Sequence, residues 1–453
     1  MERLLIEETV DKVGKKVLVK GWVKSVRKHG KIVFFDVGDR SGILQVVCEG
    51  EGEVFKMASS LGSEDVVGVF GEIRKRGERF VNKKIKTGRV EMGAEKVEVF
   101  SKAEGAPFDI EKESLDINID TLFDYRAFSL RHEKVKAIFK VQAEIAESFR
   151  KTLRGEGFKE FFGPTIVPSA TEGGADVFHI DYYKYDAYLA QSPQLYKQIM
   201  VSIFERVFTI AHAYRAEPSM TTRHMAEYIG LDAEMGFIED YKDITAMVSL
   251  VIKNVFKDVG ENCSEELELY GASLPELSEE IPMVKLKEAQ EIIFERTRRD
   301  NRKEPDLEPE DEREICKWAK EKHGSELVFI SHYPTNKRPF YTYPDPEDGD
   351  YTLSFDLIGR GVEWATGGQR INDYQMLIAN IKKFGLDVKD FEIYLQAFRY
   401  GMPAEGGFCL GLERVTQHIL GVGNVKEGSL FPRDMERVDV RLSTIQKKKK
   451  DNG

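Results

Sequence analysis

The sequence has few cysteines and no long apolar stretch. Among its 453 residues the cysteines are widely scattered and form no C-x-x-C pair; they are Cys48, Cys263, Cys316 and Cys409. Neither a zinc ribbon nor a disulfide framework is therefore expected. No run of about 18 apolar residues occurs, and the first residues, MERLLIEETVDKV, include acidic ones where a signal peptide is apolar. We expect a cytoplasmic protein in a reducing compartment, without a membrane span.

The two commonest nucleotide-binding signatures are also absent. Neither G-x-x-x-x-G-K-[ST] nor G-x-G-x-x-G occurs, which argues against a P-loop and against a Rossmann fold. The chain instead carries two arginine-bearing segments, AHAYRAEPSMTTRHMAEYIGLDAEM (211–235) and GGFCLGLERV (406–415). Guanidinium groups suit phosphate oxygens, so the two segments predict a site that holds a polyphosphate without a P-loop.

Length and charge indicate more than one domain. A chain of 453 residues exceeds what one core usually supports, so two or three domains are expected. The net charge of −11 is uneven, because residues 1–100 carry 20 Lys/Arg and 16 Asp/Glu. This basic surplus is compatible with nucleic-acid binding by the first domain, although a surplus of this size also arises by chance. The KKKK run (447–450) fits a solvated tail.

The apolar pattern separates a β-rich beginning from a mixed remainder. Short alternating segments predict strands at 15–23, 31–39, 41–50 and 64–73, and about five such strands favour an OB-fold β-barrel. From residue 133 the period becomes helical, strands then alternate with helices, and further helices are expected at 374–384 and 411–420. An α+β fold follows, with helices flanking a largely antiparallel sheet. The expected boundaries are a barrel over 1–103, a linker over 104–132, a second domain over 133–440 with an acidic helical surface insertion at about 256–330, and a basic disordered tail over 441–453.

Three segments resemble the signature motifs of class II aminoacyl-tRNA synthetases. GFKEFFGPTI with Pro164 resembles motif 1, YRAE…RH resembles motif 2 and CLGLER resembles motif 3. The barrel and the phrases ATEGGADVF, LAQSPQLYKQIM, FRYGMP and LFPRD narrow the resemblance to aspartyl-tRNA synthetases of the archaeal and eukaryotic type. The resemblance implies ATP as substrate, Mg²⁺ as cofactor, tRNA(Asp) as partner and a homodimer formed through motif 1. Charging of tRNA(Asn) as well stays open.

The resemblance also implies roles for individual residues around ATP. The attacking carboxylate of aspartate is ionised at neutral pH, so catalysis rests on positioning and on stabilising charge at the α-phosphate. Arg215 matches the bridge between carboxylate and α-phosphate, and Arg414 matches the cation over the adenine; both are the expected catalytic residues. The full expected ATP site comprises Arg215, Glu217, Arg223, His224, Met225, Tyr228, Glu363, Gly411, Leu412, Glu413 and Arg414.

Amino-acid choice and metal binding are implied in the same way. Lys197 and Arg370 match two cations that bind the side-chain carboxylate of aspartate, which would leave buried charge uncompensated if asparagine bound instead. The expected aspartate site is Glu172, Gln194, Lys197, Arg215, Thr366 and Arg370. Hard carboxylate oxygens suit Mg²⁺, and the expected metal residues are Asp356, Glu363 and Thr366. Thr366 stands where the family usually has serine.

Anticodon contacts are expected on the barrel. Phe34 matches a ring that stacks on an anticodon base, with Phe35 as the alternative if the register differs by one residue. Arg27 and Gln45 match positions that contact the anticodon. Lys24 matches neither residue usual at a position that separates enzymes specific for tRNA(Asp) from those that also charge tRNA(Asn).

Three other functions stay open from the sequence. They are an asparaginyl-tRNA synthetase, which Lys197 opposes, a small-molecule ligase related to asparagine synthetase, which the barrel opposes, and a catalytically inactive tRNA-binding paralogue. The presence of Arg215, Asp356, Glu363 and Arg414 opposes the last. Cys409, inside motif 3, is expected to be a packing residue and not a nucleophile, because no base is placed beside it in the sequence.

Overall fold

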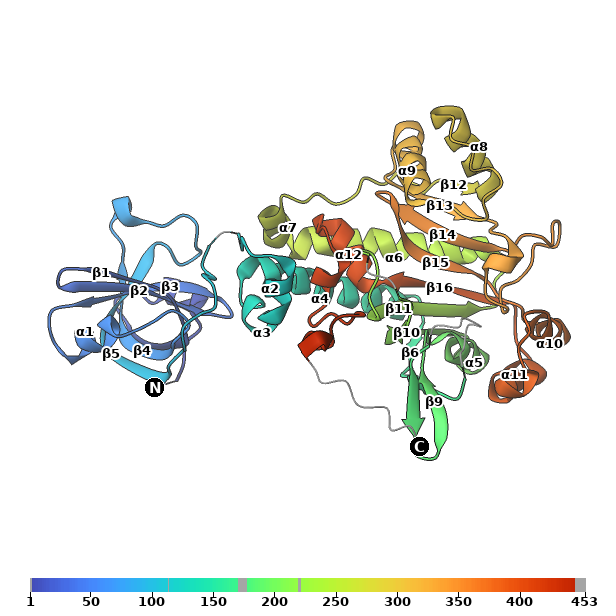
Figure 1. Cartoon of the computed structure of the whole chain (residues 1–453). Helices are drawn as coiled ribbons and strands as arrows, with labels where there is room; N and C mark the ends of the chain where they lie inside the picture. The colour runs from blue at the N-terminus through green and yellow to red at the C-terminus, as the bar shows by residue number, and fades with distance from the viewer. Residues whose placement is uncertain (1, 113, 170–176, 219–220, 445–453) are drawn as a thin grey trace. The chain divides into compact units, whose positions relative to one another are not determined.

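The chain forms two compact units, each with its own hydrophobic core. A computed structural model describes residues 2–112, 114–169, 177–218 and 221–444, and its two units are Met1–Ile117 and Asn118–Gly453 (Figure 1). The expected linker, 104–132, ends in two short helices of the second unit, α2 (Ile119–Asp124) and α3 (Arg126–Ser129). Among the described residues no helix has the length and apolarity needed to cross a membrane.

The first unit is a closed five-stranded barrel with the strand order β1-β2-β3-β5-β4. The prediction of an OB-fold is confirmed. A single helix, α1 (Glu53–Ser59), lies between the third and fourth strands in sequence. The strands are β1 (Lys16–His29), β2 (Ile32–Asp39), β3 (Gly42–Glu49), β4 (Val66–Lys75) and β5 (Val90–Ser101).

Strand β2 shows how the sequence turns one face of the barrel to the core and the other outward. Val33, Phe35 and Val37 have no solvent exposure, whereas Phe34 between them is only partly buried. Successive side chains of a strand point to opposite faces, so the alternation fixes which aromatic ring is available outside. Phe35 belongs to the core, and Phe34 is the ring on the outer face.

The second unit contains a large eight-stranded sheet and a smaller three-stranded sheet. The large sheet has the order β12-β13-β14-β15-β16-β11-β10-β6, and only the pairs β12–β13 and β10–β6 are parallel. Its strands are β6 (Lys159–Glu160), β10 (Arg206–Tyr214), β11 (Glu227–Gly236), β12 (Met283–Lys285), β13 (Leu327–Ser331), β14 (Ser354–Gly359), β15 (Val362–Gln369) and β16 (Glu405–Gly411). The small sheet pairs β7 (Ile166–Val167) with β9 (Tyr185–Leu189) and β9 with β8 (His179–Tyr182).

Three helices cover one face of the large sheet: α4 (Glu133–Gly155), α6 (Tyr241–Asn262) and α12 (Leu412–Leu420). Figure 1 shows these helices beside the sheet, and their apolar faces share a core with Leu231 of β11 and Phe408 of β16. Because strand side chains alternate, the neighbouring residues Asp232 and Cys409 point to the opposite face. Near that face lie α5 (Gln194–Phe204), α10 (Tyr374–Lys383) and α11 (Glu392–Arg399), which share a second core.

The region expected as a surface insertion of helices, 256–330, is partly built into the sheet. It begins inside α6, where Phe256 and Val259 are buried in the main core. It then supplies the edge strand β12 and its neighbour β13, against which two helices pack through Leu286 and Ile315. The acidic residues therefore mark the solvent-facing sides of these helices, and their buried sides are ordinary core. The helices are α7 (Ser264–Tyr270), α8 (Leu286–Thr297) and α9 (Pro309–His323).

Candidate active site

A pocket of about 330 Å³ lies against the sheet face that carries Asp232 and Cys409. Strands β11, β15 and β16, helices α5 and α12, and the loop between β13 and β14 all contribute to its wall. Most of the residues expected to bind ATP and aspartate line it, although they are spread over more than 200 positions of the sequence. Those residues are Gln194, Lys197, Arg215, Arg223, His224, Met225, Tyr228, Glu363, Thr366, Arg370, Gly411, Glu413 and Arg414.

Three of the expected residues that the structure describes do not line this pocket. Glu172 lies outside the described residues, and Leu412 packs into the core at the start of α12. Glu217 lines a neighbouring, mostly apolar pocket of about 500 Å³, which shares Arg215, His224 and Met225 with the first. Asp356 is buried beside the pocket with 6% of its surface exposed.

The motif 2 loop and the first turn of α12 bring three arginines to one end of the pocket, the Arg414 end. The β10–β11 pairing reaches Tyr214 and Glu227, and the loop between them is held by a hydrogen bond from Arg215 N to Ala226 O at 2.9 Å. The Arg215 guanidinium lies 5.4 Å from the Tyr228 ring centroid. On α12, Arg414 Nη1 donates to the backbone oxygen of Glu363 at 3.0 Å.

The electrostatics of the Arg414 end favour a polyanion. Burial, together with Arg414, Arg215 and Arg223, holds the pKa of His224 below its ordinary value despite the nearby Glu217. A neutral imidazole among three guanidinium groups indicates a strongly positive surrounding field. The positive potential of this end is what a triphosphate requires.

Glu312 of α9 is a neighbour of this end that the sequence did not single out. Its carboxylate lies 3.3 Å from Arg223 Nη1. Burial raises the pKa of Glu312 to about 7, although Arg223 opposes the shift. The ion pair holds Arg223 in place, and a phosphate would compete with a carboxylate that is only partly ionised near neutral pH.

The expected metal residues lie on adjacent strands. Asp356 of β14 pairs in register with Thr366 of β15, and Glu363 lies on the same strand. Burial, followed by the charge of Asp356, raises the pKa of Glu363, which places the two carboxylates in one field. Among the described residues, Asp356 Oδ1 is buried without a hydrogen-bond partner. A raised pKa and a bare buried oxygen both fit a divalent cation here, with phosphate oxygens completing its ligands.

No group of three or more His, Cys, Asp or Glu side chains in the described ranges is placed to hold a metal by itself. Arg338, which the sequence did not single out, supplies the positive charge instead. Its Nη2 lies 2.7 Å from Asp356 Oδ2, and its Nη1 donates to Thr366 Oγ1 at 3.1 Å. The guanidinium also stacks 3.9 Å from the Tyr333 ring centroid. It is held by the fold and neutralises Asp356.

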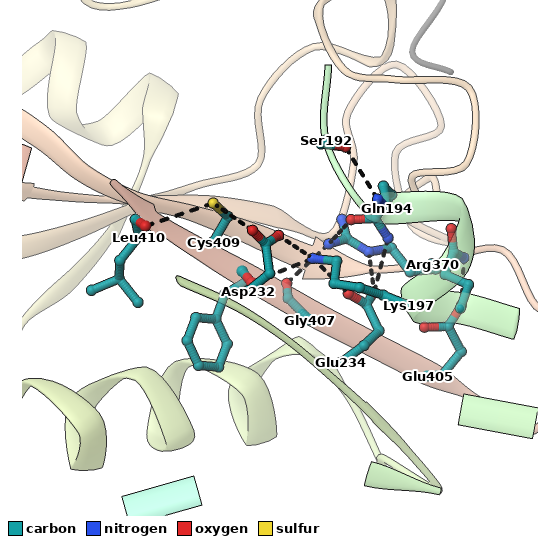
Figure 2. A network of polar contacts seen from close by, with 12 residues as sticks. Ser192, Gln194, Lys197, Asp232, Glu234, Arg370, Glu405, Gly407, Cys409 and Leu410 are labelled. Atoms are coloured by element: carbon teal, nitrogen blue, oxygen red, sulfur yellow. Dashed lines mark hydrogen bonds and ion pairs between the residues drawn. The ribbon is translucent and has the colours of Figure 1, made fainter. Parts of the chain in front are cut away.

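Lys197 and Arg370 both line the pocket and lie together in the part that we call the Lys197 end (Figure 2). Both are ion-paired with carboxylates of β11 that the sequence did not single out. Lys197 Nζ lies 2.8 Å from Asp232 Oδ1 and 3.1 Å from Glu234 Oε2, and Arg370 Nε lies 2.7 Å from Glu234 Oε1. Burial lowers the pKa of Lys197, but Asp232 and Glu234 outweigh it, so the lysine stays charged.

The partners of Lys197 follow from strand alternation. In LDAEM the apolar Leu231 and Ala233 face the core, so the two acidic residues must face the pocket side. An acidic residue at every second position of an otherwise buried strand was the available signal. Cys409 Sγ donates to Asp232 Oδ2 at 3.3 Å, and burial followed by Asp232 raises the pKa of the thiol well above its ordinary value. The thiol is therefore protonated.

The three expected anticodon residues lie on one outer patch of the barrel. Arg27 and Phe34 are paired across β1 and β2, and the His29 and Phe34 rings meet edge to face with their centroids 6.3 Å apart. Arg27 Nη2 donates to Gln45 Oε1 at 3.3 Å and lies 3.2 Å from Asp36 Oδ2. One aromatic ring, one guanidinium and one amide thus face the same side, as reading of single-stranded bases requires.

Comparison with known proteins assigns both units. Residues 17–100 match the OB-fold nucleic acid binding domain, and residues 118–435 match the tRNA synthetases class II (D, K and N). The aspartate–tRNA(Asp/Asn) ligase of Thermus thermophilus is 41% identical over 96% of this chain and 99% of its own. The aspartate–tRNA(Asp) ligase of Pyrococcus abyssi is 39% identical over 95% of this chain and 98% of its own.

A solved structure supports the same assignment. The asparaginyl-tRNA synthetase of Pyrococcus horikoshii, complexed with asparaginyl-adenylate, superposes with a TM-score of 0.87 at 29% identity, over 97% of this chain and 99% of its own. Its identity to this chain is lower than that of the two aspartate–tRNA ligases. The family match over most of the chain and the full-length relatives show that this protein belongs to the class II tRNA synthetases of the D, K and N group.

Proposed function

We propose that this chain is an aspartate–tRNA ligase, which activates L-aspartate with ATP and transfers the aspartyl group to the 3′ end of tRNA(Asp). One observation carries the proposal: a single pocket has paired cations at its Lys197 end and three arginines at its Arg414 end. An amino acid with an acidic side chain fits the first end and a triphosphate fits the second. The reacting carboxylate and α-phosphate then meet between them, beside Arg215.

The first step joins the two substrates. An oxygen of the aspartate α-carboxylate attacks the α-phosphorus of ATP, the bond from that phosphorus to the oxygen bridging to the β-phosphate breaks, and pyrophosphate leaves. Arg215 is placed to hold both reacting groups and to stabilise the charge that gathers on the α-phosphate. Arg223 and Arg414 hold the remaining phosphates and the base. Asp356 and Glu363 would hold Mg²⁺, which supplies further positive charge to the phosphates when bound.

The second step transfers the aspartyl group. The terminal hydroxyl of the tRNA attacks the aspartyl carbonyl carbon. The bond between that carbon and the oxygen bridging to the phosphate breaks, and AMP leaves with this oxygen. The apolar pocket of about 500 Å³ supports this step, because it opens beside Arg215 and Met225, which it shares with the first pocket. A terminal nucleotide held there would present its sugar hydroxyl to the adenylate.

We further propose the assembly and the partners of the enzyme. Motif 1 exposes Phe162, with 86% of its surface accessible, and this supports a homodimer through that segment. The barrel patch of Arg27, Phe34 and Gln45 supports recognition of the anticodon. Relatives of nearly equal similarity act on tRNA(Asp) alone or on tRNA(Asp/Asn), so aminoacylation of both purified tRNAs decides the range. A role in translation places the protein in the cytoplasm.

Pyrophosphate exchange into ATP, without tRNA, tests the first step. We expect exchange with aspartate and little with asparagine, and we expect Arg215→Ala to lower kcat by about a hundredfold or more because a transition-state contact is lost. Arg206→Ala, at the far end of the same strand β10, is the matched control and should keep its exchange rate. Exchange with asparagine in preference to aspartate, or an active Arg215→Ala enzyme, would refute the assignment.

A further inference from the structure

Two buried glutamates lie next to each other behind the Lys197 end of the pocket, and the mechanism above uses neither as a substrate ligand. Glu234 lies on β11 and Glu405 opens β16, and neither has any solvent exposure (Figure 2). Neither lines the pocket itself. Two carboxylates side by side in a buried place cannot both stay ionised without a large cost, so their protonation has a consequence for the pocket.

The hydrogen bonds around the pair leave one gap. Glu405 Oε1 accepts from Gln198 Nε2 at 2.6 Å, and Tyr394 OH donates to Gln198 Oε1 at 3.0 Å, which fixes the amide orientation. Glu234 Oε1 accepts from Arg370 Nε at 2.7 Å and from Gln194 Nε2 at 3.2 Å. Oε2 of Glu405 is buried and, within the described part of the chain, has no hydrogen-bond partner, whereas Oε2 of Glu234 is ion-paired with Lys197 Nζ at 3.1 Å.

A proton on Glu405 gives its bare oxygen a hydrogen bond. The two carboxyl groups are within hydrogen-bonding reach of each other, so a protonated Glu405 donates to Glu234. Burial, followed by the charge of Glu234, raises the pKa of Glu405 well above its ordinary value. Burial also acts on Glu234, but Arg370 and Lys197 outweigh it and lower the pKa of that group. The proton therefore resides on Glu405.

This proton balances the charges behind the pocket. The groups that face the pair are the cations Lys197 and Arg370, the anions Asp232 and Glu234, and the neutral side chains of Gln194, Gln198, Tyr341 and Tyr394. With Glu405 protonated, the two cations and two anions cancel. Ionised Glu405 would leave one negative charge in excess beneath the two cations that face the substrate side chain.

We propose that Glu405 is a positioning residue whose proton, held against Glu234, sets the preference of the pocket for aspartate over asparagine. The inference rests on the proposed function of the Lys197 end. Loss of the proton weakens the hold of Lys197 and Arg370 on a negatively charged side chain but leaves the neutral asparagine side chain almost unaffected. Aspartate binding and protonation of Glu405 therefore favour each other.

Two variants of similar size separate the proton from the shape of the side chain. Glu405→Gln keeps a neutral group that donates to Glu234 at every pH, and we expect its KM for aspartate at neutral pH to stay within about threefold of the wild type. Glu405→Met fills the space but donates nothing, and we expect at least about a tenfold rise in that KM, with kcat changed less. Equal KM values for the two variants would overturn the role of the donor.

The pH profile tests the proton itself. The ratio of the asparagine inhibition constant to the aspartate KM, measured by pyrophosphate exchange as the pH is raised from about 6, should fall in the wild type once Glu405 begins to ionise, by up to about tenfold per pH unit. In Glu405→Gln the ratio should not change with pH in this way. Ionisation of the two amino acids affects the wild type and the variant equally, so it cancels when the two profiles are compared. Superimposable profiles would overturn the proposal.

Calorimetry gives a check that needs no variant. Aspartate binding to the wild type, titrated in buffers of different ionisation enthalpy towards the alkaline end of the range, should show net proton uptake, and asparagine binding should not. Equal proton uptake with both ligands would contradict the proposal. A wild type that exchanges no pyrophosphate with aspartate would instead reject the proposed function, so the two failures are distinguishable.

Discussion

Glu413 shows how a single buried carboxylate in the active site makes stability depend on pH. Both of its oxygens lie 3.1 Å from the backbone nitrogen of Ile229, and burial raises its pKa to about 7 despite that bond. A folded-state pKa above the unfolded value of about 4.5 gives stability that is complete below the unfolded value and is lost as pH rises through 7.

Glu413→Gln removes this titration. Between about pH 4.5 and about pH 8, we expect the wild type to lose about 2–3 kcal/mol of unfolding free energy relative to the variant. Urea unfolding at the two pH values measures it. Glu261→Gln, on the exposed side of α6, is the control and should show no such change. A constant difference for Glu413→Gln would contradict the buried titration.

At this scale the sequence predicted the residues that face the ligands better than those that support them. Arg215, Arg414 and Lys197 stand in segments with a recognisable order, and the pocket brings them together. Arg338 and Glu405 stand in no such segment. Their importance depends on the charges opposite them: Asp356 lies across a loop from Arg338, and Glu234 lies on a strand more than 100 positions before Glu405, so no local pattern reveals either pair.

Close strand packing in β16 depends on glycine. Gly407 lies between Glu234 of β11 and Gly368 of β15, and a Cβ atom there would clash with the backbone oxygen of Ala233 and with the Glu234 carboxylate. The strand can approach its neighbours only because no side chain intervenes. The same approach brings the carboxylate of Glu234 within reach of both Lys197 and Arg370.

Gly407→Ala should therefore disturb both the sheet and the pocket. We expect about 2–4 kcal/mol of destabilisation in thermal unfolding, together with a raised KM for aspartate, because Glu234 is displaced. Gly423→Ala is the matched control, since a Cβ atom there meets nothing within 4 Å. An unchanged melting temperature for Gly407→Ala would show that the sheet can relax around the new atom.

Elements with a clear period were predictable, and mixed ones were not. The helix expected from residue 133 is α4, the one expected at 374–384 is α10, and of the two rings left open at 34 and 35, the structure buries Phe35 and leaves Phe34 partly exposed. The acidic composition of residues 256–330 indicated a surface insertion of helices, but it describes only the exposed sides of those helices. The edge strand β12, which has three residues, gave no periodic signal of its own.

At the scale of the whole molecule, the exposed motif 1 segment makes a prediction about assembly. Phe162→Asp places a charge at the proposed dimer contact and should shift the protein towards the monomer, with at least about a tenfold weaker dimer. Light scattering coupled to size-exclusion chromatography measures the mass. Val13→Asp, at a site with 49% exposure on the barrel unit, is the control. A wild type that is already monomeric would reject the dimer.

The position of β16 has a consequence for synthesis of the chain. It is the last strand in sequence, yet it lies between β15 and β11, in the interior of the large sheet. Until residues 405–411 leave the ribosome, β11 and β15 present unpaired backbone edges that invite wrong pairing. The sheet is thus closed by a strand delivered late in translation. The pocket, whose wall includes β16, therefore forms only after residues 405–411 have paired with β11 and β15.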